Sequence, residues 1–145
     1  MSKRRKIVVT LVIVLAVVML GMQFKQPDRT NPPVESEIDA PPEVAAILER
    51  ACYACHSNET TWPWYSYVAP VSWWVAEHVE HGRGDLNFST WPARDLEALE
   101  HAFHEIDEQI EKGEMPLPSY LRMHPEARLS DEDRATLREW AKANS

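Results

Sequence analysis

The sequence predicts an all-α protein in which one apolar helix precedes a single small helical domain. Apolar residues recur every three or four positions in four segments between residues 43 and 145, which indicates amphipathic helices. No segment competes with them by showing the alternating pattern of a strand. The segment from Ile7 to Phe24 is different, because it is uncharged and largely apolar throughout. We therefore divide the chain into a basic tail (1–6), an apolar segment (7–24), a proline-rich linker (25–42) and the domain (43–145).

The apolar segment is long enough to cross a membrane. At a helical rise of about 1.5 Å per residue it reaches roughly 27 Å, close to the thickness of the hydrocarbon core of a bilayer. Four cationic residues precede it, namely Lys3, Arg4, Arg5 and Lys6. By the positive-inside bias they stay in the cytoplasm, which sends the domain to the opposite side. The alternative is a cleaved secretory signal, but the residues that follow offer no small-x-small cleavage site, so we predict a retained anchor.

A proline-rich segment follows the apolar run. Its five prolines are Pro27, Pro32, Pro33, Pro41 and Pro42. Proline removes a backbone donor and favours extended, semi-rigid chain. We therefore expect residues 25–42 to form neither helix nor sheet and to hold the domain off the membrane.

Charge is distributed unevenly along the chain. All 23 acidic residues lie beyond Phe24 together with 11 of the 15 basic ones, so this part carries 11 minus 23, or −12. An acidic domain should repel nucleic acid and anionic lipid, and it would be steered toward a basic protein surface. Ordinary solubility explains the charge equally well, so charge alone identifies no partner.

Four segments are expected to form the helices of the domain. The first covers Val44–Ala51, and the second runs from Val68 to a stop near Gly82 and Gly84. The longest follows Ser89 and Thr90 as caps, holds Pro92 in its first turn and ends at Gly113, with apolar residues at Leu96, Leu99, Phe103, Ile106 and Ile110. The last starts at the cap Ser130, with three acidic residues in its first turn, and buries Leu137, Trp140 and Ala141.

The chain has two cysteines, and both lie in the run Cys52-Tyr53-Ala54-Cys55-His56, which has the form C-x-x-C-H. This is the attachment sequence for c-type haem, in which two thioethers hold the porphyrin and the adjacent histidine binds the iron. We predict one covalent haem c, held by Cys52 and Cys55, with His56 as the proximal iron ligand. No βαβ pattern surrounds the cysteines, which disfavours a thioredoxin-like role. Bacteria attach c-type haem outside the cytoplasm, so we assign the anchor to the bacterial inner membrane and the domain to the periplasm.

Met115 is the candidate for the opposite side of the iron. It follows the helix end at Gly113 and precedes Pro116, so it lies in a loop from which its thioether can point inward. Small cytochromes c place a loop methionine beside a proline at this position, and the segment resembles their distal loop. The alternative is a methionine that fills a gap in the core. Met123 lacks the matching loop.

Histidines are the other candidate ligands for iron or for zinc. Two pairs have helical spacing, His78 with His81 and His101 with His104. Neighbouring glutamates already explain both pairs as solvated helix faces. No cysteine is left to complete a zinc site with them. His124, just before a proline, is expected in a loop.

Aromatic residues are concentrated after the haem motif. Trp62, Trp64, Tyr65, Trp73 and Trp74 offer flat apolar area that is expected to exclude water from the porphyrin. A haem propionate could be held by one of Trp62, Trp64, Tyr65 and Tyr120, or by the guanidinium of Arg83.

Several sequence blocks resemble those of a known family. They are C-x-x-C-H-S-N, W-P-W-Y-S, A-P-V-S-W, L-N-F-S-x-W and a later M-P loop, and they fall between about Ala51 and Trp140. This pattern is similar to that of the small haem-binding domain family of bacterial envelope proteins. The resemblance implies a cytochrome c-like fold with one covalent haem held through Cys52, Cys55 and His56, with Met115 as the distal ligand.

The leading functional hypothesis is a membrane-anchored monohaem c-type cytochrome that transfers electrons through His/Met-ligated haem to a redox partner protein. The alternative is a haem-based sensor or ligand-binding module with an exchangeable sixth position. A peroxidase would need an open iron and a placed acid or base, and the spacing of the histidines puts none over the iron. We therefore expect an electron carrier rather than an enzyme, without contact to nucleic acid.

Overall fold

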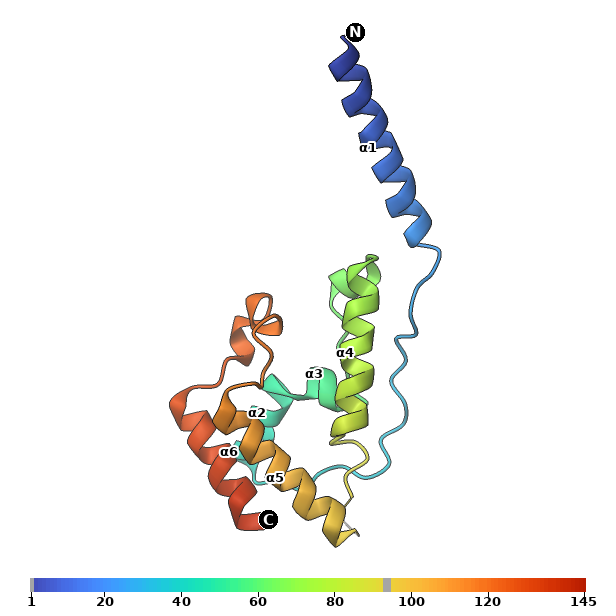
Figure 1. Ribbon diagram of the computed structural model, residues 1–145. Helices are drawn as coiled ribbons and strands as arrows, with labels where there is room; N and C mark the ends of the chain where they lie inside the picture. Colours follow the sequence, from blue (N-terminus) through green and yellow to red (C-terminus); the bar gives the residue numbers. More distant parts are fainter. Residues whose placement is uncertain (1, 93–94) are drawn as a thin grey trace. The chain divides into compact units, whose positions relative to one another are not determined.

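The computed structural model describes residues 2–92 and 95–145, and the regular elements in these ranges are all helical. Six α-helices and three short 3-10 helices follow one another along the described chain (Figure 1). Their bounds are α1 Lys3–Met22, α2 Pro42–Ala51, α3 Tyr53–His56, η1 Trp64–Tyr67, α4 Val71–Asp85, α5 Leu96–Lys112, η2 Tyr120–Arg122, η3 Pro125–Ala127 and α6 Asp131–Asn144. The all-α prediction and the apolar N-terminal helix are confirmed.

The chain forms two compact units. The first unit contains the residues up to Thr30 together with Trp62–His78. The second unit contains Asn31–Thr61 together with Val79–Ser145. Helix α4 therefore begins in the first unit and ends in the second.

Helix α1 has the length and composition of a membrane span. Its 20 residues correspond to about 30 Å, the thickness of a bilayer core. An 18-residue stretch of it has a mean hydropathy of 2.3, and none of the helix is buried in the protein. The hydroxyl of Ser2 caps its N-terminus by accepting a hydrogen bond from the backbone of Arg5 at 3.4 Å. One helix of the described chain is thus able to cross a membrane.

Part of the proline-rich segment is attached to the second unit. The backbone N–H of Ser36 donates to the carbonyl of Ser89 at 3.1 Å, and its own carbonyl accepts from Trp91 at 2.7 Å, which gives an isolated parallel bridge. Two residues further on, Ile38 is buried in the core and its N–H donates to the carbonyl of Phe88 at 3.1 Å. No strand forms in residues 25–42, all of which the structure describes, so the expectation of no sheet is confirmed. The isolated bridge forms because an extended chain leaves its remaining N–H groups free to pair with a neighbouring extended segment.

The core of the second unit is built from amphipathic helices. Helices α5 and α6 pack along each other, and α2 packs against α6 (Figure 1). The buried side chains they contribute are Val44, Ile47, Leu48, Ala51, Ala102, Phe103, Ile106, Ile110, Leu137 and Ala141. The faces follow the three-and-four spacing of the sequence, so the predicted helical periodicity is confirmed for these three helices.

Two predicted helix ends are confirmed. Gly113 ends α5 with φ of 70°, a left-handed conformation that glycine adopts without steric cost. Ser130 begins α6 with a capping box, in which its hydroxyl accepts from the backbone of Asp133 and the Asp133 carboxylate accepts from the backbone of Ser130.

One predicted helix start is wrong. Helix α5 begins at Leu96, where the Asp95 carboxylate caps it by accepting from the backbone of Ala98 at 3.1 Å. Ser89, the expected cap, instead accepts through its hydroxyl from the backbone of Asn58 at 2.9 Å. Helix α4 ends at Asp85, next to Gly84, so the stop expected near Gly82 and Gly84 is confirmed. The helix continues through both glycines, because glycine costs a helix interior only about 1 kcal/mol.

Candidate functional site

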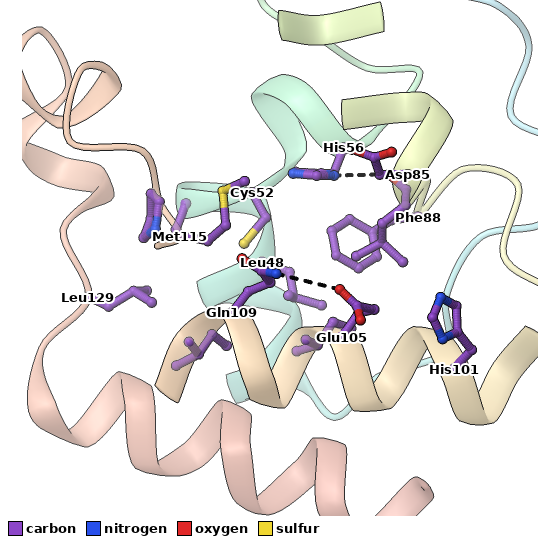
Figure 2. A pocket seen from close by; sticks show the side chains of 15 residues that line it. Leu48, Cys52, His56, Asp85, Phe88, His101, Glu105, Gln109, Met115 and Leu129 are labelled. Atoms are coloured by element: carbon purple, nitrogen blue, oxygen red, sulfur yellow. Dashed lines mark hydrogen bonds between the residues drawn. The ribbon is translucent and has the colours of Figure 1, made fainter. Parts of the chain in front are cut away.

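A cavity of about 500 Å³ lies within the second unit. Figure 2 shows side chains from α2, α5 and the loops around them converging on this space. Much of its wall is apolar, formed by Leu48, Ala51, Phe88, Ile106, Ile110 and Leu129. Ligand pockets typically measure about 300–1,000 Å³ with largely apolar walls, so the cavity has the size and chemistry of a site for a small apolar ligand or cofactor.

The C-x-x-C-H motif lies at one side of this cavity. Cys52 ends α2, and the next residues form the single turn α3, in which the backbone N–H of His56 donates to the carbonyl of Cys52 at 2.9 Å. Cys52 and His56 both line the cavity. Cys55 is not among the lining residues. The structure thus brings two of the three motif side chains to the cavity itself.

The imidazole of His56 is held by two backbone carbonyls. Its Nδ1 lies 2.9 Å from the carbonyl oxygen of Gly82 and 3.0 Å from that of Leu86. Because carbonyl oxygens only accept hydrogen bonds, Nδ1 carries the proton and donates it. The other ring nitrogen, Nε2, keeps its lone pair for a metal ion. This is the arrangement by which proteins fix the tautomer of a metal-binding histidine and raise its basicity.

Gly82 lets α4 approach the motif closely. A Cβ atom at this position would lie 2.9 Å from the backbone oxygen of Cys55 and 3.2 Å from its Cβ. A distance below 3.0 Å to a backbone atom requires the backbone to shift, so only glycine fits here without rearrangement. In the sequence, Gly82 stands inside a helical pattern, and such a glycine can mark either a helix end or a close approach of two backbones. We interpreted it as a helix end and missed the close approach of α4 to Cys55.

Met115 reaches the same cavity from the loop after α5. The carbonyl of Gln109 accepts hydrogen bonds from the backbone of Glu114 at 3.1 Å and of Met115 at 3.4 Å, which fixes the loop to the end of the helix. Met115 and Pro116 line the cavity together with His56 (Figure 2). Met123 is instead 56% exposed on the surface. Of the two methionines weighed as iron ligands, Met115 is the one placed at the site.

The two thiols are protonated at neutral pH. Burial raises the pKa of Cys52 to about 12, with the neighbouring Cys55 adding to the shift and Arg50 opposing it. Burial also raises the pKa of Cys55, against the effect of Arg83. A reactive cysteine requires a thiolate, which a positive environment stabilises and burial in apolar surroundings does not. The arrangement therefore does not suit thiol–disulfide exchange.

Helix α5 contributes three polar side chains to the cavity, and sequence reasoning missed them as a group. His101, Glu105 and Gln109 are four residues apart, so they lie on one face of the helix. The Gln109 amide donates to the Glu105 carboxylate at 3.5 Å (Figure 2). From the sequence, only His101 with His104 was considered on this helix, and that pair was interpreted as a solvated face. In the described ranges, no group of three or more histidine, cysteine or carboxylate side chains is placed to hold a separate metal ion.

The aromatic residues expected around the cofactor lie elsewhere. Trp62, Trp64, Tyr65, Trp73 and Trp74 belong to the first unit, whereas the lining residues of the cavity all belong to the second. The expectation is wrong, because aromatic residues near a motif in sequence need not lie near it in space.

Phe88 is the aromatic side chain of the second unit that lines the cavity. Its ring lies edge-on to His56 with centroids 6.3 Å apart and stacks with Tyr53 at 5.4 Å and with Trp91 at 6.0 Å. It therefore fixes one face of the histidine and belongs to a continuous aromatic core.

Two of the residues considered for a propionate, Arg83 and Tyr120, are engaged in other contacts. The guanidinium of Arg83 donates to the Ser57 carbonyl at 2.8 Å, to the Asn31 amide oxygen at 2.8 Å and to the Thr60 hydroxyl at 3.0 Å. Tyr120 stacks on His124 with centroids 4.2 Å apart. Arg83 thus ties the segments before and after the motif together.

Comparison with known proteins agrees with this site. No curated protein and no solved structure matches the chain. The family model described as a haem-binding domain matches residues 17–143, which include the cavity, the C-x-x-C-H motif and the Met115 loop. The match covers most of the chain, and the chain belongs to the haem-binding domain family.

Proposed function

We propose that this haem-binding protein is a membrane-anchored c-type cytochrome that carries one covalent haem and transfers electrons. One observation carries the proposal. Cys52 and His56 of the C-x-x-C-H motif and Met115 of the loop after α5 line the same largely apolar cavity. No other pair among the candidate ligands weighed from the sequence combines a fixed imidazole with a neutral thioether at one site.

The residues of the cavity fit a haem. Cys52 at the cavity and Cys55 three residues later would supply the two thioethers. Addition of a thiol across a vinyl group would form one S–C bond, place the thiol proton on the neighbouring carbon and consume no oxidant. His56 offers Nε2 as a neutral nitrogen ligand, because its Nδ1 proton is donated to the carbonyls of Gly82 and Leu86. The apolar walls exclude water from a largely apolar ring.

When bound, haem supplies a one-electron couple between ferrous and ferric iron. The residues of the chain would set its potential. A methionine thioether opposite a histidine raises the potential, and exclusion of water by Leu48, Ile106 and Phe88 disfavours the extra charge of the ferric form. The carbonyls that hold His56 act in the opposite direction by making the ring a stronger donor.

The proposed location is the bacterial inner membrane, with the second unit in the periplasm. Helix α1 is long and apolar enough to cross a bilayer. The four cationic residues at its start support a cytoplasmic N-terminus. The net charge of −12 beyond Phe24 supports a redox partner with a basic surface, which would be steered to the acidic domain.

A second candidate is a haem sensor that binds a small ligand at the sixth position. It is favoured by the polar face of α5, where Glu105 and Gln109 line the cavity and could donate or accept hydrogen bonds to a bound ligand. The two candidates differ in one property: a sensor would allow an added ligand to replace Met115 on the iron, whereas an electron carrier would keep Met115 bound.

Carbon monoxide binding to the reduced protein tests the proposal. The full chain is expressed with the cytochrome c maturation machinery, and covalent haem is detected by haem staining after denaturing electrophoresis. We expect slow carbon monoxide binding by the unmodified protein and by Met123→Ala, whose side chain is exposed, and fast binding with a lowered potential in Met115→Ala. Fast binding that Met115→Ala leaves unchanged would favour the sensor, and an absence of covalent haem would refute the c-type assignment.

A further inference from the structure

The segment that carries most tryptophans of this protein has no charged residue. Residues 62–76 contain four of the six tryptophans and two of the four tyrosines, without a single aspartate, glutamate, lysine or arginine. This is unusual in a chain whose remaining part beyond Phe24 holds 23 acidic and 11 basic residues. The segment belongs to the first unit, apart from the cavity residues of the second. Cofactor binding therefore leaves its composition unexplained.

Several large apolar side chains of this segment are exposed. Trp64 is 73% exposed and Tyr67 54%, and Val68, Val71 and Trp74 are each more than two-fifths exposed. Val71 and Trp74 are three residues apart on the first turns of α4, so they share one side of that helix. We call these five residues the aromatic face. A soluble surface rarely exposes so many large apolar side chains close together, and such patches mark contact with a protein or a membrane.

Hydrogen bonds attach this segment to the chain that leaves α1. The Gln23 side-chain amide donates to the Ala69 carbonyl at 3.2 Å, and its oxygen accepts from the Ala69 N–H at 3.1 Å. The indole of Trp73 donates to the carbonyl of Lys25 at 2.5 Å. Gln23 is the C-cap of α1, so residues 69–73 are fixed at the end of that helix.

Arg29 adds a further link within the first unit. Its guanidinium donates to the carbonyl of Ser66 at 3.2 Å and lies 4.4 Å from the centre of the Tyr67 ring. This contact orders the ring of Tyr67 by a cation–π interaction. Hydrogen bonds and this cation–π contact thus attach the segment that carries the aromatic face to the residues at the end of α1.

We propose that the aromatic face lies in the headgroup region of the membrane that α1 crosses. The proposal rests on the membrane anchoring stated under the proposed function. Tryptophan and tyrosine are enriched at the boundary of lipid and water, because their rings enter the apolar layer while their N–H and O–H groups stay at the polar one. The absence of charge from residues 62–76 removes the cost of bringing an ion to that layer.

The position of the aromatic face at the end of α1 favours a lipid surface over a protein partner. The face is fixed by Gln23 and Lys25 to the residues where the apolar helix ends, which is the depth at which a span of about 30 Å meets the headgroups. Phe24, at the same helix end, is 91% exposed. It adds another ring at this level.

Photo-crosslinking of the full-length holoprotein distinguishes lipid from protein. Trp64→p-benzoyl-phenylalanine and Trp74→p-benzoyl-phenylalanine place a photoreactive ring on the aromatic face. The matched control is Leu96→p-benzoyl-phenylalanine, because Leu96 is 79% exposed but belongs to the second unit. Each variant is reconstituted in vesicles of phosphatidylethanolamine and phosphatidylglycerol, irradiated, and analysed by mass spectrometry, and native membranes are treated in the same way. We expect lipid adducts at positions 64 and 74 in large excess over position 96.

Flotation and haem staining of the same samples separate the possible failures. Protein that does not float with the vesicles would overturn both the anchoring and the aromatic face. Protein that floats but gives no lipid adducts at positions 64 and 74, or gives them equally at position 96, would overturn the aromatic face alone. Adducts to another protein in native membranes would also overturn it. Lipid adducts in a protein without covalent haem would leave this inference in place and refute only the c-type assignment.

Discussion

Aromatic residues are concentrated in both units of the protein, but their environments are opposite. In the second unit Phe88, Trp91 and Phe103 are at most 6% exposed and contact one another ring to ring. In the first unit Trp64 and Trp74 remain largely exposed. Composition alone therefore cannot assign an aromatic cluster to a cofactor or to a surface, whereas burial separates the two.

The hydrogen bonds of the two units also hold different features in place. In the second unit backbone carbonyls orient His56, a side chain that lines the cavity. In the first unit Gln23 and Trp73 join the aromatic segment to the end of α1. One unit is organised around a cavity and the other around the exit of an apolar helix, which suggests that cofactor binding and membrane contact can be altered separately.

The largest effect is expected on haem content, which substitutions in the second unit should abolish and substitutions in the first unit should leave unchanged. Cys52→Ser combined with Cys55→Ser removes both thiols, so no thioether can form and covalent haem is expected to be lost completely. Trp64→Ser combined with Trp74→Ser alters the first unit and is expected to retain full covalent haem. Haem staining after denaturing electrophoresis measures both. Loss of haem in the tryptophan variant would show that the aromatic face is needed for the site after all.

The second prediction compares one buried and one exposed aromatic residue. Phe88→Ala removes a ring that is 1% exposed and contacts Tyr53, His56 and Trp91, so it is expected to lower the free energy of unfolding by about 3–5 kcal/mol. Trp64→Ala, measured in detergent, is expected to change it by no more than about 0.5 kcal/mol. Urea unfolding followed by circular dichroism gives both values. Equal losses would mean that Trp64 is buried by a contact within the protein.

Gly82→Ala is expected to have the third largest effect. The new Cβ would meet the Cys55 backbone oxygen at 2.9 Å, and overpacking of this kind costs about 1–3 kcal/mol. It should also disturb the carbonyl that accepts from His56, so the midpoint potential of the haem protein is expected to shift.

Gly84→Ala is the matched control for that substitution. It lies two residues later on α4, and a Cβ there would meet nothing within 4 Å. Alanine is favoured over glycine in a helix by up to about 1 kcal/mol, so this variant should be as stable as the parent or more stable. If Gly82→Ala behaved like Gly84→Ala, the close approach of α4 to the motif would be wrong.

These contrasts also show how much could be predicted from the sequence. The all-α fold, the apolar helix and the ends at Gly113 and Ser130 follow from periodicity and capping residues, which act over a few positions. Met115 at the cavity followed from a local loop pattern, although its binding to iron stays a prediction.

Features that depend on distant contacts could not be predicted. The role of Gly82 depends on the approach of Cys55, and the burial of Ile38 depends on pairing with residues 88–91. The tryptophans after the motif were assigned to the porphyrin because an aromatic ring suits either environment. A one-dimensional pattern states which residues are apolar, but not which apolar surface they meet.

Charge is the last property in which the two regions differ, and it gives the smallest expected effect. Residues 62–76 carry no charge, whereas α5 and α6 of the second unit are joined by Arg138, whose guanidinium lies 2.6 Å from the Asp107 carboxylate and 2.7 Å from that of Glu111. The hydrogen bond from Arg138 is the main cause that lowers the pKa of Asp107. A lowered pKa means that the folded state favours the charged carboxylate, so this contact stabilises the protein above the unfolded pKa of about 3.9 and is lost as the pH falls through the folded value.

Asp107→Asn should therefore lower the free energy of unfolding near neutral pH by at most about 1 kcal/mol, since the pair is partly solvated. The difference from the parent protein should shrink as the pH falls below the unfolded pKa of about 3.9 and through the lower folded value, because the Asp107 carboxyl is then protonated and as uncharged as the asparagine amide. Glu139→Gln, on an exposed position of α6, is the control and should change the stability little at either pH. A loss in Asp107→Asn that is independent of pH would mean that the aspartate acts through packing rather than charge. In that case Asp107 would hold α5 against α6 without a net contribution from its charge.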